Sequence, residues 1–184
     1  MTGFRSGFAA VVGRPNVGKS SLVNAMVGQK VTITSSSPNT TRGAPRGVVS
    51  RPGAQLVVVD TPGLHRPKTA LGDRLNAAAS SSLVDLDCVL VVLDAAARLG
   101  HGDRRALEGA VRALSPSARP DGRPLLVVVV NKIDRDRGGA LVRLSEAAAA
   151  VDELCSETEV AGRPPAGGPV EFFPTSATTG EGVD

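Results

Sequence analysis

The chain has 184 residues, a normal size for one α/β domain, and it carries four Phe and neither Trp nor Tyr. So few aromatic side chains argue against a β-sandwich and against an aromatic stacking platform for single-stranded nucleic acid. The net charge of +3 is small and the basic residues are scattered, which does not indicate a nucleic-acid surface.

The two cysteines, Cys88 and Cys155, show no Cys–x–x–Cys or Cys/His spacing, so neither a zinc site nor a disulfide framework is expected. A reducing cytosol fits this cysteine usage. No signal peptide and no apolar run of about 18 residues is present, so we expect a soluble domain.

Near-continuous Val and Leu runs predict strands that are covered on both faces, as in a parallel sheet. In chain order these runs are 8–13, 54–60, 87–94, 124–131 and 170–176. The Arg-flanked run 46–51 is followed by Pro52-Gly53, which indicates a hairpin turn and an antiparallel edge strand.

Helical stretches separate these runs, and the last of them is Ala-rich with apolar residues at spacings of three and four. They are 19–29, 72–85, 103–114 and 139–157. Strands that alternate with helices predict a doubly wound α/β fold with helices on both faces of a mostly parallel six-stranded sheet. The Pro/Gly/Arg-rich segments 115–124 and 159–169 are expected to be loops. A closing helix would be expected after TSATTGEGVD, where the chain stops.

The segment GRPNVGKS, residues 13–20, fits the phosphate-loop pattern, follows a strand and opens a helix. Gly13 and Gly18 let the backbone turn its N–H groups toward phosphates, and the helix N-terminus adds partial positive charge. Lys19 is expected to reach the β- and γ-phosphates, and the Ser20 hydroxyl to bind Mg²⁺. The predicted nucleotide contacts here are Gly13, Arg14, Pro15, Asn16, Val17, Gly18, Lys19, Ser20 and Ser21.

A second element, Asp60-Thr61-Pro62-Gly63, ends the run AQLVVVD about 40 residues after the phosphate loop. We expect Asp60 to hold Mg²⁺ through water and the Gly63 N–H to bond a γ-phosphate oxygen. Leu64 follows, where Ras-type proteins carry a glutamine that orients the attacking water. Leucine cannot orient water.

The third element is Asn131-Lys132-Ile133-Asp134, after PLLVVVV. The Asp134 carboxylate can accept hydrogen bonds from guanine N1–H and the 2-amino group, a donor pair that adenine lacks. Leaving Asp134 unpaired against ATP would cost roughly 1–3 kcal/mol. Asn131 should bridge loops and touch the base, and the Lys132 stem should cover one face of the ring.

Two shorter segments complete the predicted site. In Thr175-Ser176-Ala177-Thr178 we expect the Ala177 N–H to bond guanine O6, with Ser176 and Thr178 beside it. In Pro38-Asn39-Thr40-Thr41-Arg42, Thr41 is the predicted third Mg²⁺ ligand, with Thr40 as the alternative. This polar segment is expected to order when GTP is bound.

Taken together, these motifs resemble those of the Era family of bacterial P-loop GTPases. The resemblance rests on GRPNVGKSSLVNAMVGQKVTITSSSPNTTR, VDTPGLHRPKTALGDRLNAAASSSLVDLD, VVNKID and TSATTGEGVD, and covers about residues 6–184. It implies a three-layer P-loop NTPase fold for 1–184, an Era-type GTPase domain that stops before its closing helix. The C-terminal KH domain, through which Era proteins bind RNA, would be absent.

The resemblance implies a Mg²⁺-dependent GTPase that acts in 16S rRNA processing and small-subunit assembly, with Lys19, Thr41 and Gly63 as the catalytic set. It implies a cytoplasmic monomer, with peripheral association at the inner face of the cell membrane left open. Asn16 matches a phosphate-loop asparagine that helps bind K⁺ in some relatives, although a loop-shaping role is the alternative. The other functional hypotheses are a switch whose hydrolysis needs a ribosome or a further domain, and an ATPase or nucleotide kinase, against which NKID argues.

Overall fold

The computed structural model describes residues 4–28, 46–60, 87–113, 125–159 and 170–183. Within these ranges the strands are β1 (Arg5–Val12), β2 (Arg46–Arg51), β3 (Ala54–Asp60), β4 (Cys88–Asp94), β5 (Leu125–Asn131) and β6 (Val170–Pro174). The helices are α1 (Lys19–Val27), α3 (His101–Ala113) and α4 (Arg137–Glu159). The predicted helix 72–85 lies outside the described residues.

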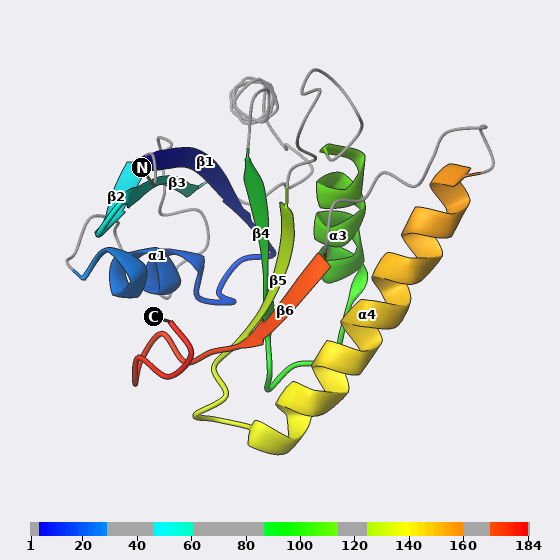
Figure 1. The fold of residues 1–184 in the computed structure, drawn as a ribbon. Coiled ribbons are helices and arrows are strands. Elements are labelled where there is room, and N and C mark those ends of the chain that lie inside the picture. Colours follow the sequence, from blue (N-terminus) through cyan, green and yellow to red (C-terminus); the bar gives the residue numbers. More distant parts are fainter. Residues whose placement is uncertain (1–3, 29–45, 61–86, 114–124, 160–169, 184) are drawn as a thin grey trace, which may run out of the picture.

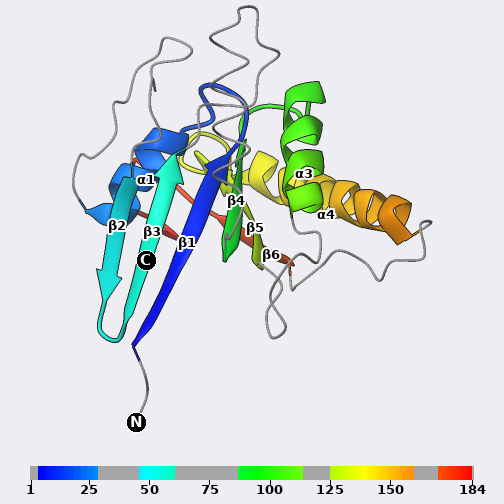
Figure 2. The same ribbon diagram turned by 90° about the horizontal axis from the view of Figure 1, so that it is seen from above.

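The strands form one sheet in the order β2-β3-β1-β4-β5-β6 (Figure 1). Every neighbouring pair is parallel except β2–β3, which the predicted hairpin at Pro52-Gly53 joins in antiparallel register (Figure 2). The α/β class and the single antiparallel edge strand are therefore confirmed. The one marked boundary difference is β1, which begins at Arg5 because Arg5–Phe8 still pair with β3.

Helices cover the two faces of the sheet separately, as the alternating strand side chains require. On β1, Ala9 and Val11 belong to the core shared with α1, whereas Ala10 and Val12 belong to the core shared with α3 and α4. Figures 1 and 2 show α1 on one side and α3 with α4 on the other. Val, Leu and Ala fill both cores, and Ile133 adds to the core shared with α3 and α4, as the scarcity of aromatic residues predicts.

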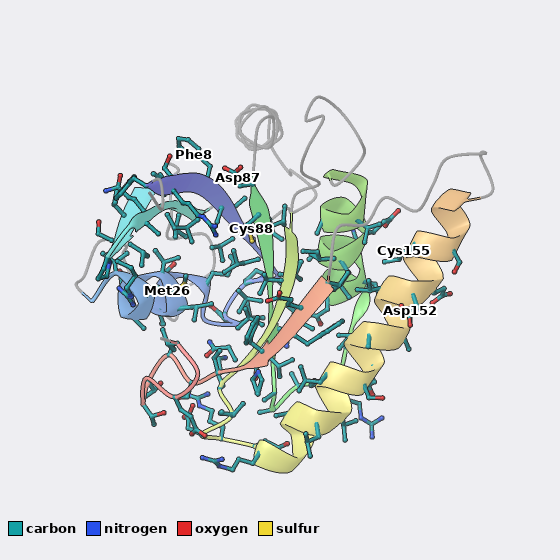
Figure 3. The ribbon with its side chains drawn as sticks, in the orientation of Figure 1. Phe8, Met26, Asp87, Cys88, Asp152 and Cys155 are labelled. Atoms are coloured by element: carbon teal, nitrogen blue, oxygen red, sulfur yellow. The ribbon has the colours of Figure 1, made fainter. Side chains whose placement is uncertain are left out.

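The cysteines lie on different faces (Figure 3). Cys88 begins β4 and packs against the α1-side core, and Cys155 packs from α4 against the other core. Burial raises the pKa of the Cys88 thiol from 9.0 to about 12, with the negative charges of Asp87 and Glu171 adding to the effect. Among the described helices, none combines the length and apolarity that a membrane crossing requires.

The carboxyl ends of the five parallel strands lie at one edge of the sheet. There β1 leads into the loop 13–18, β3 ends at Asp60, β4 at Asp94, and β5 at Asn131. The loops after β1, β5 and β6 come together beside the start of α1 (Figure 1). In open α/β sheets this edge is where ligands bind.

Candidate functional site

The loop between β1 and α1 turns through backbone conformations that favour glycine. Gly13, Asn16 and Gly18 have φ values of 148°, 63° and 100°. A Cβ atom at Gly13 would lie 2.4 Å from the carbonyl oxygen of Val92, so only glycine fits there. Left-handed residues in such a loop are typical of the backbone nests that bind anions, and α1 begins directly after it at Lys19.

Lys19 lies over this loop. Its Nζ donates to the carbonyl oxygens of Gly13 at 2.8 Å and Arg14 at 2.9 Å. These two bonds hold the positive charge of the Lys19 ammonium group against the loop backbone, and a point charge there can attract an anion. Ser20 and Ser21 follow in the first turn of α1 and are half-buried.

The residues predicted to hold Mg²⁺ are described only in part. The backbone of Asp60 pairs with that of Val11, two residues before the phosphate loop, so β3 delivers Asp60 to the same edge as Ser20. A hydroxyl and a carboxylate are oxygen ligands that suit Mg²⁺. The side chain of Asp60 lies outside the described structure, as do Thr40, Thr41, Thr61, Pro62, Gly63 and Leu64.

The side chain of Asn131 joins three loops, as predicted for a bridging residue. Its Nδ2 donates to Val17 O at 3.0 Å, and its Oδ1 accepts from the Ala177 N–H at 3.0 Å and from Thr175 Oγ1 at 3.4 Å. The side chain is buried. A Cβ atom at Gly18 would lie 2.3 Å from Asn131 Nδ2, so this contact also requires glycine at position 18.

Asp134 and Ser176 lie in neighbouring loops and their side chains form a hydrogen bond. Ser176 Oγ donates to Asp134 Oδ1 at 2.6 Å and accepts from the Thr179 N–H at 3.1 Å. The Asp134 side chain is exposed at the edge of the sheet, and its carboxylate oxygens can accept further hydrogen bonds. Thr178 is also exposed. The Ala177 N–H already donates to Asn131 Oδ1. The predicted bond from this N–H to guanine O6 would therefore make it a donor to two acceptors.

Lys132 extends over the phosphate loop from a left-handed backbone position, with φ of 69°. Its Nζ donates to Asn16 O at 2.5 Å and to Asp94 Oδ2 at 2.6 Å. Asp94, at the end of β4, was not among the predicted site residues. The available signal was its place at the end of the apolar run DCVLVVLD, which brings it to the same edge of the sheet.

Arg14 connects the phosphate loop to α3. Its Nε donates to Asp103 Oδ1 at 3.0 Å, while Asp103 Oδ2 accepts from the Gly100 N–H at 3.0 Å. Asp103 is buried, so its charge is compensated inside the protein by this pair. The sequence predicted that Arg14 contacts nucleotide but gave no signal for Asp103.

The Asn16 side chain is exposed, and none of the hydrogen bonds that the structure gives among its described residues involves it. No group of three or more His, Cys, Asp or Glu side chains within the described ranges could form a metal site. The metal ligands expected from the sequence are Ser20, Asp60 and Thr41, with Thr40 as the alternative to Thr41, and Asn16 for K⁺; Thr40 and Thr41 lie outside the described residues.

Comparisons with known proteins agree with this geometry. A family model described as "50S ribosome-binding GTPase" matches residues 8–132. GTPase Era of Corynebacterium glutamicum is 44% identical over 184 residues, covering 99% of this chain and 53% of that protein. The chain thus spans about half the length of the curated relatives it matches.

Two solved structures are similar in fold. Era in complex with MgGDPNP and nucleotides 1506–1542 of 16S ribosomal RNA is 32% identical, with a TM-score of 0.71 over 96% of this chain and 52% of its own. A variant of Aquifex aeolicus Era bound to GDP·AlF4⁻ is also 32% identical, with a TM-score of 0.68 over 96% and 52%. Since the family model covers more than half of its residues, this chain belongs to the family of 50S ribosome-binding GTPases, and along nearly its whole length it is similar to Era proteins.

Proposed function

We propose that this chain binds guanine nucleotides and hydrolyses GTP slowly as a molecular switch. The observation that carries the proposal is the contact of Asn131 with both Val17 and Ala177, which joins the phosphate loop to the loops expected to hold the base. A single ligand with phosphates at one end and a purine at the other would bridge these loops. Relatives bound to GDPNP and GDP support a guanine nucleotide.

Asp134 is the residue that would select guanine. Ser176 orients its carboxylate by a hydrogen bond to Oδ1. The carboxylate then accepts from guanine N1–H and the 2-amino group, and charge-assisted bonds of this kind are worth roughly 1.5–3 kcal/mol. ATP offers no matching donors, so an ATPase or nucleotide kinase is disfavoured.

Lys19, Thr41 and Gly63 form the proposed catalytic set. Lys19 compensates charge on the β- and γ-phosphates, while the Gly63 N–H and Thr41 lie on segments expected to close on the γ-phosphate. The residues that would hold Mg²⁺ are Ser20, Asp60 and Thr41, with Thr40 as the alternative to the last. When bound, Mg²⁺ neutralises charge that develops on the phosphates.

Slow turnover is expected because Leu64 replaces the water-orienting glutamine. We expect a rate of about 10⁻⁴–10⁻² s⁻¹. The exposed side chain of Asn16 is free of described hydrogen bonds and lies on the phosphate loop, which suits a ligand of K⁺. A cation there would supply positive charge near the transferring phosphate, as an arginine finger does in other GTPases.

The proposed biological role follows the relatives, one of which was solved with part of 16S ribosomal RNA. We propose that the protein acts in 16S rRNA processing and small-subunit assembly. Its RNA contact would depend mainly on a KH domain of the kind expected in Era proteins. A monomeric, cytoplasmic protein is the proposed state, and vesicle flotation tests for peripheral binding at the inner membrane surface.

Displacement of a fluorescent GDP derivative by GDP and by ATP tests the assignment. GDP should displace it at far lower concentration than ATP, and equal displacement would contradict guanine selectivity.

Phosphate release from GTP–Mg²⁺ should be faster in K⁺ than in Na⁺ buffer, and equal rates would remove K⁺ from the mechanism. Single-turnover hydrolysis with and without small ribosomal subunits separates an autonomous enzyme from a switch that its partner activates.

A further inference from the structure

Asp94 and Lys132 form a partly buried ion pair at the centre of the site. The side chains are 13% and 19% exposed, and Lys132 Nζ lies 2.6 Å from Asp94 Oδ2. The same Nζ donates to Asn16 O, so one ammonium group joins the end of β4 to the phosphate loop. Partial burial protects such a pair from screening by salt.

Asp94 is itself held in place. Its Oδ1 accepts from the Ala96 N–H at 3.0 Å, and the Ala95 N–H donates to Asn131 O at 2.9 Å. Asp94 and Asn131 are also register partners at the ends of β4 and β5. The carboxylate therefore has one oxygen committed to its own turn and the other directed at Lys132.

The Lys132 stem lies close to the start of α1. A Cβ atom at Gly18 would be 3.8 Å from Lys132 Cε. Lysine stems have many rotamers, and an ion pair at the tip restricts them before a ligand arrives. Preorganisation of this kind increases affinity because less conformational entropy is lost on binding.

We propose that Asp94 is a positioning residue for nucleotide binding, one that fixes the Lys132 stem as an apolar surface for the base and fixes Asn16 through the same ammonium group. The inference rests on the proposed function, since it requires that a guanine nucleotide occupies this edge of the sheet. It assigns no contact between Asp94 and the nucleotide. Its effect should appear in the affinity for GDP.

The test is GDP affinity of Asp94→Asn in the full 184-residue chain. This variant keeps an oxygen to accept from Ala96 and loses the charge that pairs with Lys132. We expect GDP to bind about tenfold more weakly, through faster dissociation. The matched control is Glu153→Gln, which neutralises a carboxylate paired with Arg104 on α3 and α4, and should bind GDP normally.

A double-mutant cycle shows whether Asp94 acts through Lys132. Lys132→Met keeps an apolar stem without charge, and in that background Asp94→Asn should cause no further loss of GDP affinity. An equal loss in both backgrounds, or wild-type affinity of Asp94→Asn, overturns the inference. Should Asp94→Asn fail to fold, Lys132→Met alone decides, because unchanged GDP affinity in that variant contradicts the proposed pair. Failure of the unmodified chain to bind GDP is a separate result that overturns the proposed function as well.

Discussion

Asn131 Nδ2 donates a hydrogen bond to the carbonyl oxygen of Val17 at 3.0 Å, although 114 residues separate the two in the chain. The same side chain accepts from the Ala177 N–H. One buried amide thus fixes the relative positions of the phosphate loop and both loops that follow β5 and β6. The relative placement of these three loops depends on this side chain.

Replacement Asn131→Ala should therefore weaken both the fold and the site. The variant leaves Val17 O and the Ala177 N–H without their partner in a buried region, which should lower the free energy of unfolding by about 2–4 kcal/mol. GDP affinity should fall at least tenfold, because the loops lose their shared anchor. Urea unfolding and titration with fluorescent GDP measure the two effects.

The control for this change is Gln55→Ala, which removes an exposed amide that bonds Ser50 Oγ at 3.3 Å on the β2–β3 hairpin. Its unfolding free energy should change by less than about 0.5 kcal/mol. A similar loss in both variants would mean that Asn131 contributes no more than a surface amide.

Gly18 and Gly28 offer a matched pair at the two ends of α1. Both have left-handed backbone, with φ of 100° and 75°, but only a Cβ at Gly18 would collide, at 2.3 Å from Asn131 Nδ2. Gly28→Ala should cost about 1–2 kcal/mol of unfolding free energy from backbone strain alone. Gly18→Ala should cost about 1–3 kcal/mol more and reduce GDP binding. Thermal or urea unfolding of both variants tests this difference, and equal costs would exclude the collision.

Motif order and strand patterning were enough to predict most of the fold. Parallel strands buried on both faces leave a near-continuous apolar run, and each predicted run appears as a strand of the sheet. The edge strand Arg46–Arg51 was also predictable, because the Pro52-Gly53 turn specifies a hairpin. The start of β1 at Arg5 was missed because Arg5-Ser6-Gly7 carries no apolar signal and pairs with β3 only in the folded sheet.

Site residues could be predicted where a sequence motif specifies the local backbone conformation. They could not be predicted where the contact joins side chains from distant parts of the chain. Gly13 and Gly18 have the positive φ values that a tight phosphate-loop turn favours, and Asn131 bridges loops as expected. Asp94 and Asp103 escaped prediction because an isolated acid at a strand end or a helix start has many ordinary roles. The sheet register places Asp94 beside Asn131, and the folded structure shows its ion pair with Lys132, the next residue.

Cys88 should make stability depend on alkaline pH. Its pKa is raised from 9.0 to about 12 in the folded protein, chiefly by burial, so the unfolded chain loses this proton first as pH rises. The contribution is fully present below pH 9 and is lost progressively up to about pH 12, by at most about 1.4 kcal/mol per pH unit. Urea unfolding under reducing conditions should show a steeper alkaline decline for the unmodified protein than for Cys88→Ala. If the unfolding free energy of both proteins declined equally with rising pH, the raised pKa of Cys88 would be contradicted. Lysine titration affects both proteins alike, so it cancels in this comparison.

Asp134→Asn should change which base the site prefers. An asparagine still accepts from N1–H, but its amide donates where the carboxylate accepted, so it repels the 2-amino group of guanine and matches the 2-oxo group of xanthine. GDP affinity should fall about a hundredfold or more, and xanthosine diphosphate should become the better competitor for a fluorescent nucleotide. The fold should be preserved, because the amide oxygen can still accept from Ser176 Oγ.

Asp136→Asn is the matched control two residues along, where the side chain accepts a hydrogen bond from the Gly139 N–H at 2.7 Å. That variant should retain the preference for GDP, and an Asp134→Asn protein that did the same would show that this carboxylate does not read the base.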